Sequence, residues 1–217
     1  MTGTSQARTS MINSQLRPNR MNDEDIIHAI EGVKREEFVP KAMRGVAYCD
    51  DDINIGGGRY LMEPMVFAKL LGYAEIKKSD LVLDIGCAMG YSSAVISELA
   101  DAVVALEQEA KLAAKAEETL AAQDIVNVAV VTGSHATGVA KQGPYDVIFV
   151  GGAVADIPSK LTAQLKEGGR LVCVKLENSV GRGHLIRKVN GDLVIERLFD
   201  ANVPVLAGFE AKESFVF

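Results

Sequence analysis

The sequence has few cysteines, and their spacing suits neither a disulfide framework nor a zinc site. Cys49, Cys87 and Cys173 are odd in number and far apart, without a Cys-x-x-Cys pair or a histidine at ligand spacing. A disulfide-stabilised or metal-binding domain is therefore not expected. A reducing compartment fits this pattern best, and we expect the chain to be cytoplasmic.

The chain also lacks an excess of positive charge and any long apolar run. Its 23 lysines and arginines are outnumbered by 29 aspartates and glutamates, which gives a formal net charge of −6. A nucleic-acid partner is not expected, because phosphate binding depends on clustered basic side chains. No stretch of about 18 apolar residues is present, nor is the apolar segment of a secretion signal, so neither membrane spanning nor secretion is expected.

What the sequence does contain is an ordinary globular mixture, with 48% hydrophobic and 24% charged residues among 217. This length is enough for one substantial hydrophobic core. We expect a single domain over residues 1–217. Residues 1–79 form its helical N-terminal part and an active-site loop, and residues 80–217 form its core.

Hydrophobic periodicity and turn residues predict the order of the elements. Helices are expected near residues 11–16, after the cap Asp23, and over 64–71, 90–99, 110–122 and 157–165. Strands are expected over 81–85, 102–106, 126–131, 145–150 and 170–175, then an antiparallel hairpin over 185–189 and 193–199. The alternation predicts an α/β fold, a doubly wound, mostly parallel Rossmann-like sheet with N-terminal helices and a C-terminal hairpin.

The loop over residues 48–63 is long and rich in acids and glycines. It contains three consecutive aspartates, Asp50 to Asp52, and three consecutive glycines, Gly56 to Gly58. Such a loop inside a compact domain is usually functional. A surface hairpin is the simpler alternative.

Residues 81–93 read LVLDIGCAMGYSS, an apolar strand followed by a small-residue turn and the start of a helix. Small residues after such a strand let the backbone approach a ligand closely, beneath the amide-rich end of the helix. In the dinucleotide pattern G-x-G-x-x-G, counted from Gly86, the second and third positions hold Ala88 and Tyr91. NAD is therefore disfavoured. Glu107, 21 residues beyond Gly86, suits the ribose of another nucleotide.

The chain resembles the protein-L-isoaspartate O-methyltransferases along nearly its whole length. The shared stretches are MINSQLRP at 11–18, REEFVP at 35–40, Ile55-Gly56 through Pro64, LDIG at 83–86 through Tyr91, PYDVI at 144–148, and LKEGGRLV at 165–172 onward to Pro204. The first pair and the loop are specific to the family. The resemblance implies a methyltransferase fold, S-adenosyl-L-methionine as cofactor with S-adenosyl-L-homocysteine as product, and isoaspartyl residues of damaged proteins as substrates.

The resemblance also assigns site residues. The cofactor residues that it implies are Asp84, Gly86, Cys87, Ala88, Gly90, Glu107, Gln108, Ser134, His135 and Gly151. In the loop, Met62 stands at the family's catalytic serine and Tyr60 at its threonine, with Glu63 next in the chain, so no catalytic residue is assigned. Ala88 replaces the middle glycine of the turn, and Ser134 replaces the aspartate expected at the adenine.

The chemistry leaves several acceptors open. A carboxylate is already ionised at neutral pH and needs no general base, so its methylation depends on positioning. An alcohol or amine would need a base, and the candidates are Asp50 to Asp52, Glu63 and His135. The alternatives are a family member that methylates another acceptor, a cofactor-binding protein without catalysis, and an NAD enzyme. The sequence gives no indication of oligomeric state.

Overall fold

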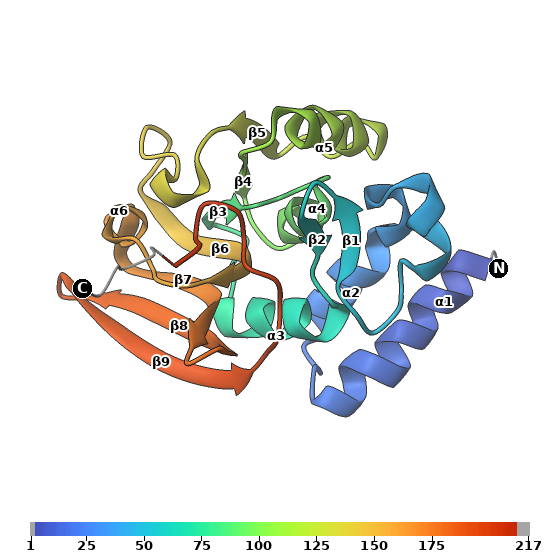
Figure 1. Cartoon of the computed structure of the whole chain (residues 1–217), viewed down its shortest axis with the longest axis horizontal. Coiled ribbons are helices and arrows are strands. Elements are labelled where there is room, and N and C mark those ends of the chain that lie inside the picture. Colours follow the sequence, from blue (N-terminus) through green and yellow to red (C-terminus); the bar gives the residue numbers. More distant parts are fainter. Residues whose placement is uncertain (1–2, 212–217) are drawn as a thin grey trace, which may run out of the picture.

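The computed structural model describes residues 3–211 and is built around one seven-stranded sheet (Figure 1). The strand order is β5-β4-β3-β6-β7-β8-β9. The strands are β3 (Leu81–Ile85), β4 (Ala102–Glu107), β5 (Val128–Thr132), β6 (Tyr145–Val154), β7 (Leu165–Glu177), β8 (Val180–Val189) and β9 (Asp192–Asp200). Strands β3 to β7 pair in parallel, and β8 and β9 add an antiparallel hairpin. The predicted fold class is confirmed.

The chain reverses its direction of travel across the sheet between β3 and β6. From β3 it moves outward through β4 to β5, and then returns to place β6 on the other side of β3. Ligands of open parallel sheets bind beyond the carboxyl ends of the strands at such a switch point. The predicted glycine turn follows β3 directly, so it lies at this position.

Apolar side chains pack on both faces of the sheet because parallel strands are covered on both sides. Within β3, Val82 belongs to one buried cluster, whereas Leu83 and Ile85 belong to the other. The first face carries most of the helices, namely α2 (Glu24–Gly32), α3 (Pro64–Ala74), α4 (Tyr91–Ser97) and α5 (Ala110–Ala122). The second face carries the one-turn helix α6 (Ser159–Thr162) and a segment near the C-terminal end of the described chain.

The N-terminal part contains α1 (Gly3–Met11), a π-helical turn at Ile12–Leu16, α2, and three 3₁₀ turns at Arg17–Asn19, Arg35–Phe38 and Lys41–Val46. The side chain of Asp23 accepts hydrogen bonds from the backbone N–H groups of Asp25 and Ile26, which confirms the predicted cap. The loop over residues 48–63 contains a small antiparallel hairpin of β1 (Ile53–Gly56) and β2 (Arg59–Leu61). This hairpin stands over the turn after β3 (Figure 1).

Several predicted boundaries are wrong: α3 ends at Ala74 rather than residue 71, β5 begins at Val128 rather than residue 126, and β8 begins at Val180 rather than residue 185. Further differences lie around β6 and β7. The helix expected over 157–165 is only the single turn of α6, because Leu165 already pairs with Tyr145 as the first residue of β7. The strand expected from residue 170 therefore begins earlier. β6 continues to Val154, beyond the expected end at residue 150. The turn between β8 and β9 is of the predicted primed type, since Asn190 and Gly191 both have positive φ, 54° and 85°.

Candidate cofactor and acceptor site

The site is organised by the backbone turn that follows β3. Gly86 and Gly90 adopt φ of 81° and 98°, values that favour glycine. Gly151 in β6 is close to this turn, because a Cβ built on it would lie 3.1 Å from the carbonyl oxygen of Gly86. Cys87 is buried, and burial raises the pKa of its thiol well above the ordinary value, which disfavours the nucleophilic thiolate. The turn is thus a close-packed platform rather than a reactive group.

Ala88 adopts a conformation that suits glycine better. Its φ is 52°, in the left-handed region, which costs an L-residue about 1 kcal/mol. In return its backbone N–H points at the end of β4 and donates a hydrogen bond of 2.9 Å to Glu107 Oε2. Alanine at this position is therefore compatible with the left-handed conformation of the turn.

Asp84, the acid within β3, has one satisfied and one unsatisfied oxygen. Its side chain is fully buried, and Oδ2 accepts hydrogen bonds from the hydroxyls of Ser92 and Ser93, at 2.6 and 2.5 Å. Within the described part of the chain, Oδ1 has no hydrogen-bond partner. Burial raises the pKa of Asp84 to about 6. A buried oxygen without a donor is an incomplete arrangement, which a cationic ligand would complete.

Glu107, at the end of β4, is in the opposite situation. The Arg59 guanidinium, which projects from β2, places Nη1 2.5 Å from Glu107 Oε1 and Nη2 3.1 Å from the carbonyl oxygen of Gly86. Burial alone would raise the pKa of this carboxyl, but hydrogen bonding at His135 and the charge of Arg59 outweigh it and hold the pKa at about 2. The acid predicted to bind a ribose is thus already paired with a cation.

The predicted adenine-side residues gather beside this acid. The backbone N–H of Gln108 lies 3.0 Å from His135 Nε2, and His135 Nδ1 lies 2.8 Å from the carbonyl oxygen of Ala207. A carbonyl only accepts, so Nδ1 carries a proton, and Nε2 also lies 3.5 Å from Glu107 Oε1. His135 is fully buried, whereas Ser134 is exposed and makes no capping hydrogen bond with its side chain. A base role for this constrained imidazole has no support in its contacts.

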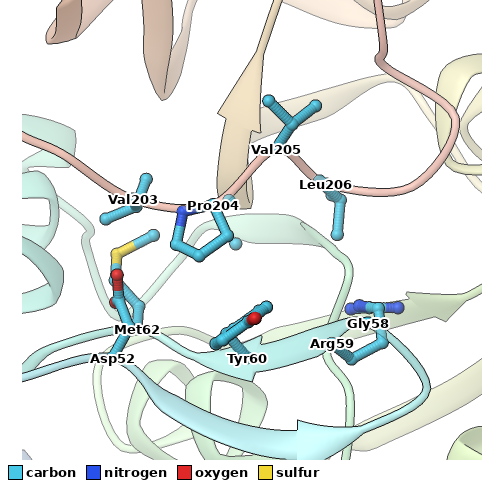
Figure 2. A pocket seen from close by; sticks show the side chains of 11 residues that line it. Asp52, Gly58, Arg59, Tyr60, Met62, Val203, Pro204, Val205 and Leu206 are labelled. Carbon is cyan, nitrogen blue, oxygen red and sulfur yellow. The ribbon is translucent and has the colours of Figure 1, made fainter.

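The loop residues line the other side of the site. Figure 2 shows Asp52, Tyr60 and Met62 below the segment Val203 to Leu206, with Arg59 at the far end. These residues border a narrow pocket of about 10 Å³, room for about one water molecule.

Backbone contacts hold the loop in place. Met62 is buried, and its carbonyl oxygen accepts a hydrogen bond of 2.7 Å from Arg35 Nη2. The backbone N–H of Glu63 donates to Asp52 Oδ1 at 2.8 Å. Burial, together with the neighbouring acids, raises the pKa of Glu63 to about 7. The loop faces the glycine turn, because Arg59 in the same loop donates to the carbonyl oxygen of Gly86.

Sequence reasoning missed two parts of this site. One is Arg59, whose only local signal is that it alternates with Tyr60 so as to share a face with Leu61. The other is the segment after β9, in which Val205 forms a bridge with Ala153 and Leu206 lies over Gly86. Both are contacts between residues far apart in the chain.

A profile of one protein family matches almost the whole chain. The family described as protein-L-isoaspartate(D-aspartate) O-methyltransferase (PCMT) matches residues 6–206. The chain belongs to this family. The predicted resemblance is therefore confirmed, and with it the assignment to a class of methyltransferases.

Individual relatives agree with the membership. A protein-L-isoaspartate O-methyltransferase of Koribacter versatilis is 36% identical, with 96% of this chain and 94% of the relative covered. One of Methanoculleus marisnigri is 38% identical over 76% of this chain and 75% of its own. A solved protein-L-isoaspartate O-methyltransferase superposes with a TM-score of 0.80 at 26% identity, over 93% of this chain and 67% of the other.

A second solved structure supports the fold alone. It is a putative protein-L-isoaspartate O-methyltransferase of Plasmodium falciparum in complex with S-adenosyl-L-homocysteine. It superposes with a TM-score of 0.81 at 21% identity, covering 93% of this chain and 98% of that one.

The residues of the chain fit the family's cofactor at two points. Asp84 Oδ1 is an unpaired buried acceptor suited to an ammonium group. Glu107 is a carboxylate at the end of the adjacent strand, suited to a ribose diol. Between them, Gly86 and Gly151 allow close approach of the backbone. The side chain of Arg59 contacts both Glu107 and the carbonyl oxygen of Gly86 in this region.

Proposed function

We propose that the chain is an S-adenosylmethionine-dependent enzyme that methylates the carboxyl group of isoaspartyl residues in proteins. The observation that carries the proposal is the pair of buried carboxylates, Asp84 and Glu107, at adjacent strand ends around a glycine turn. Asp84 has an unsatisfied oxygen, and Glu107 has the position and charge of a ribose acceptor. The family membership supports both the cofactor and the acceptor class.

In this proposal each predicted cofactor residue has a distinct task. S-adenosylmethionine, when bound, supplies an electrophilic methyl group on a sulfonium. Asp84 holds the ammonium group of the cofactor and Glu107 its ribose hydroxyls. Further cofactor contacts come from Gly86, Cys87, Ala88, Gly90 and Gly151 in the turn region, and from Gln108, Ser134 and His135 on the adenine side.

The acceptor carboxylate needs only to be aligned with the methyl group and shielded from water. An isoaspartyl carboxylate is the nucleophile in its ordinary ionised state, so no protein base takes part. The loop carrying Tyr60 and Met62, together with the segment Val203 to Leu206, lines the space beside the turn. With an acceptor bound, these side chains would exclude bulk water from the reacting atoms. Met62 offers neither a donor nor an acceptor strong enough to orient a carboxylate, so this position gives the acceptor no side-chain hydrogen bond.

We also propose that residues 1–217 act as one domain in the cytoplasm. Residues 1–79 would supply the loop, and residues 80–217 the core that holds the cofactor. Three free cysteines among the described residues fit a reducing compartment. No helix within residues 3–211 is long and apolar enough to cross a membrane.

The proposed activity is tested by transfer of a labelled methyl group from S-adenosylmethionine to an isoaspartyl peptide. The expected product is a methyl ester that base releases. The same peptide with ordinary aspartate, and the Asp84→Asn variant, serve as controls and should give no ester. Specific binding of the cofactor without any ester on the isoaspartyl peptide would contradict the proposed acceptor.

A second acceptor class is supported by the acids of the loop. Asp52 borders the pocket, and burial raises its pKa. When ionised, the Asp52 carboxylate repels an anionic acceptor. Glu63, with a pKa of about 7, has the proton affinity of a general base at neutral pH. An alcohol or amine acceptor would therefore suit the loop. Methylation of such an acceptor would give a labelled product that alkali does not hydrolyse. Loss of this product in Glu63→Gln would identify Glu63 as the general base.

The loop substitutions provide a separate test. We expect Met62→Ser combined with Tyr60→Thr to increase turnover of the isoaspartyl peptide. The increase should be about threefold if the serine makes an ordinary hydrogen bond, and up to about a thousandfold if it acts like an oxyanion-hole donor. An unchanged or lower rate in a folded variant that still binds cofactor would show that the loop does not limit carboxyl methylation.

A further inference from the structure

Arg59 is the one long charged side chain that the hairpin sends into the cofactor region. It is buried, with 5% of its surface exposed, and makes its polar contacts with the two groups that frame the ribose position. Nη1 contacts Glu107, and Nη2 contacts the carbonyl oxygen of Gly86. Figure 2 shows Arg59 at the end of the pocket beside Leu206. The guanidinium therefore lies where a bound nucleotide would meet the sheet.

With Arg59 in place, the Glu107 carboxylate has room for only one further donor. Oε1 accepts from the guanidinium and from the backbone N–H groups of Gln108 and Glu109, at 2.9 and 3.0 Å. Oε2 accepts from Ala88 N–H. Each carboxylate oxygen offers about two lone-pair sites, so three donors already crowd Oε1 and one site stays free on Oε2. Two ribose hydroxyls can bind only if a donor leaves, and Arg59 is the donor that does not belong to the strand or the turn itself.

We infer that Arg59 competes with the cofactor ribose for Glu107, so that the cofactor binds only after the tip of the β1–β2 hairpin withdraws. This inference rests on the proposed cofactor. It makes Arg59 a residue that sets cofactor affinity, because the measured dissociation constant rises as the fraction of open molecules falls.

The hairpin is built in a way that permits withdrawal. Its strands have only four and three residues, and its tip consists of Gly56, Gly57 and Gly58, all with positive φ. A Cβ on any of these glycines would meet nothing within 4 Å, so the tip itself is unpacked. Glu107 keeps its three backbone donors when Arg59 leaves; one ribose hydroxyl replaces Arg59, and the other uses the free site on Oε2. The open state is therefore accessible without stranding a buried carboxylate.

The inference is tested by titrating the full-length chain with S-adenosyl-L-homocysteine in a calorimeter. Arg59→Gln removes the charge, and we expect it to bind at least tenfold more tightly than wild type. Arg59→Lys keeps the charge but cannot contact both Glu107 Oε1 and the carbonyl oxygen of Gly86. Its affinity should lie between those of wild type and Arg59→Gln. Arg187→Gln is the matched control. Arg187 lies on β8, is only partly buried and pairs with Glu75, so its removal should leave cofactor affinity as in wild type. A cooperative thermal transition verifies that each variant is folded.

Hydrogen–deuterium exchange gives a second measurement that does not depend on affinity. Saturating wild type with S-adenosyl-L-homocysteine should increase exchange over residues 53–61, and should produce no such increase in Arg59→Gln. Equal or weaker binding by a folded Arg59→Gln, or ligand-induced protection of the wild-type hairpin, would overturn the role of Arg59 alone. No binding by wild type or by any variant would refute the proposed cofactor, and this inference with it.

Discussion

Asp84 and Glu107 are both fully buried acids at neighbouring strand ends, yet their pKa values move in opposite directions. Burial raises the pKa of Asp84 to about 6 in spite of two serine donors, and Oδ1 has no partner among the described residues. The pKa of Glu107 falls to about 2, because hydrogen bonds and the Arg59 charge outweigh burial. Burial alone therefore does not decide the charge of a site. The difference identifies one acid that lacks a cation and another that already has one.

Among the substitutions at these two acids, Glu107→Gln should have the largest effect on stability. This change leaves the Arg59 guanidinium buried without a counter-charge, so we expect a loss of about 3 to 5 kcal/mol in the free energy of unfolding at pH 7. The folded pKa lies below the ordinary value of 4.5, so the stabilisation is present above pH 4.5 and is lost as the pH falls toward 2. Urea unfolding of wild type and variant at pH 7 and pH 3 measures the loss of stability and its dependence on pH. The double variant with Arg59→Gln should recover part of the loss, and no recovery would mean that the pair is not coupled.

Asp84→Asn should increase the free energy of unfolding, whereas Glu107→Gln decreases it. The folded pKa of Asp84 lies above its ordinary value of 3.8, so the wild type loses stability as the pH rises from about 4 to 6. Asparagine removes this penalty while still accepting from the serines, and should stabilise the protein at pH 7 by about 1 to 3 kcal/mol. Asp101→Asn, at an exposed acid, is the control. A destabilised Asp84→Asn at pH 7 would mean that the wild-type carboxylate already has a partner.

Cofactor affinity should follow the titration of Asp84 and not that of Glu107. Below about pH 6 the free protein protonates Asp84, and binding of S-adenosyl-L-homocysteine should weaken about tenfold per pH unit. Glu107, with a pKa of about 2, contributes no slope in this range. Calorimetric titrations between pH 5 and 8 measure the dependence. An affinity independent of pH over this interval would remove Asp84 from the ammonium site.

Ala88→Gly should have the smallest effect. Glycine relieves the left-handed φ of 52° at this position but gains freedom in the unfolded chain. The two nearly cancel, and we expect a gain of at most about 1 kcal/mol, measured by thermal unfolding. A loss greater than 1 kcal/mol would show that the methyl group of Ala88 packs favourably beside Glu107.

Local patterns predicted the core of this fold well. The alternation of apolar runs and turns placed β3, β4 and α5 to within a residue, and the distance from Gly86 placed Glu107 at the end of β4. These features depend on periodicity and on the geometry of one strand–turn–helix unit. The same patterns identified Asp84 but not its unpaired oxygen, which depends on what every neighbouring side chain does.

The contacts that close the site were not predictable in the same way. Arg59 and Glu107 are 48 residues apart, and nothing in the composition of the glycine-rich loop indicates which way its arginine points. Leu206 reaches Gly86 only because the chain returns after the β8–β9 hairpin. A helix over 157–165 was expected from local propensity, and the pairing of β7 with β6 took its last residue into the sheet.

The most direct test of the contrast between the two acids is an NMR titration of side-chain carboxyl carbons in protein labelled at aspartate and glutamate. Asp84→Asn and Glu107→Gln assign the two signals. We predict that Asp84 titrates near pH 6, and that Glu107 remains ionised down to the lowest pH at which the protein stays folded. An Asp84 signal that titrates at or below pH 4, or a Glu107 signal that titrates above pH 4.5, would contradict the account.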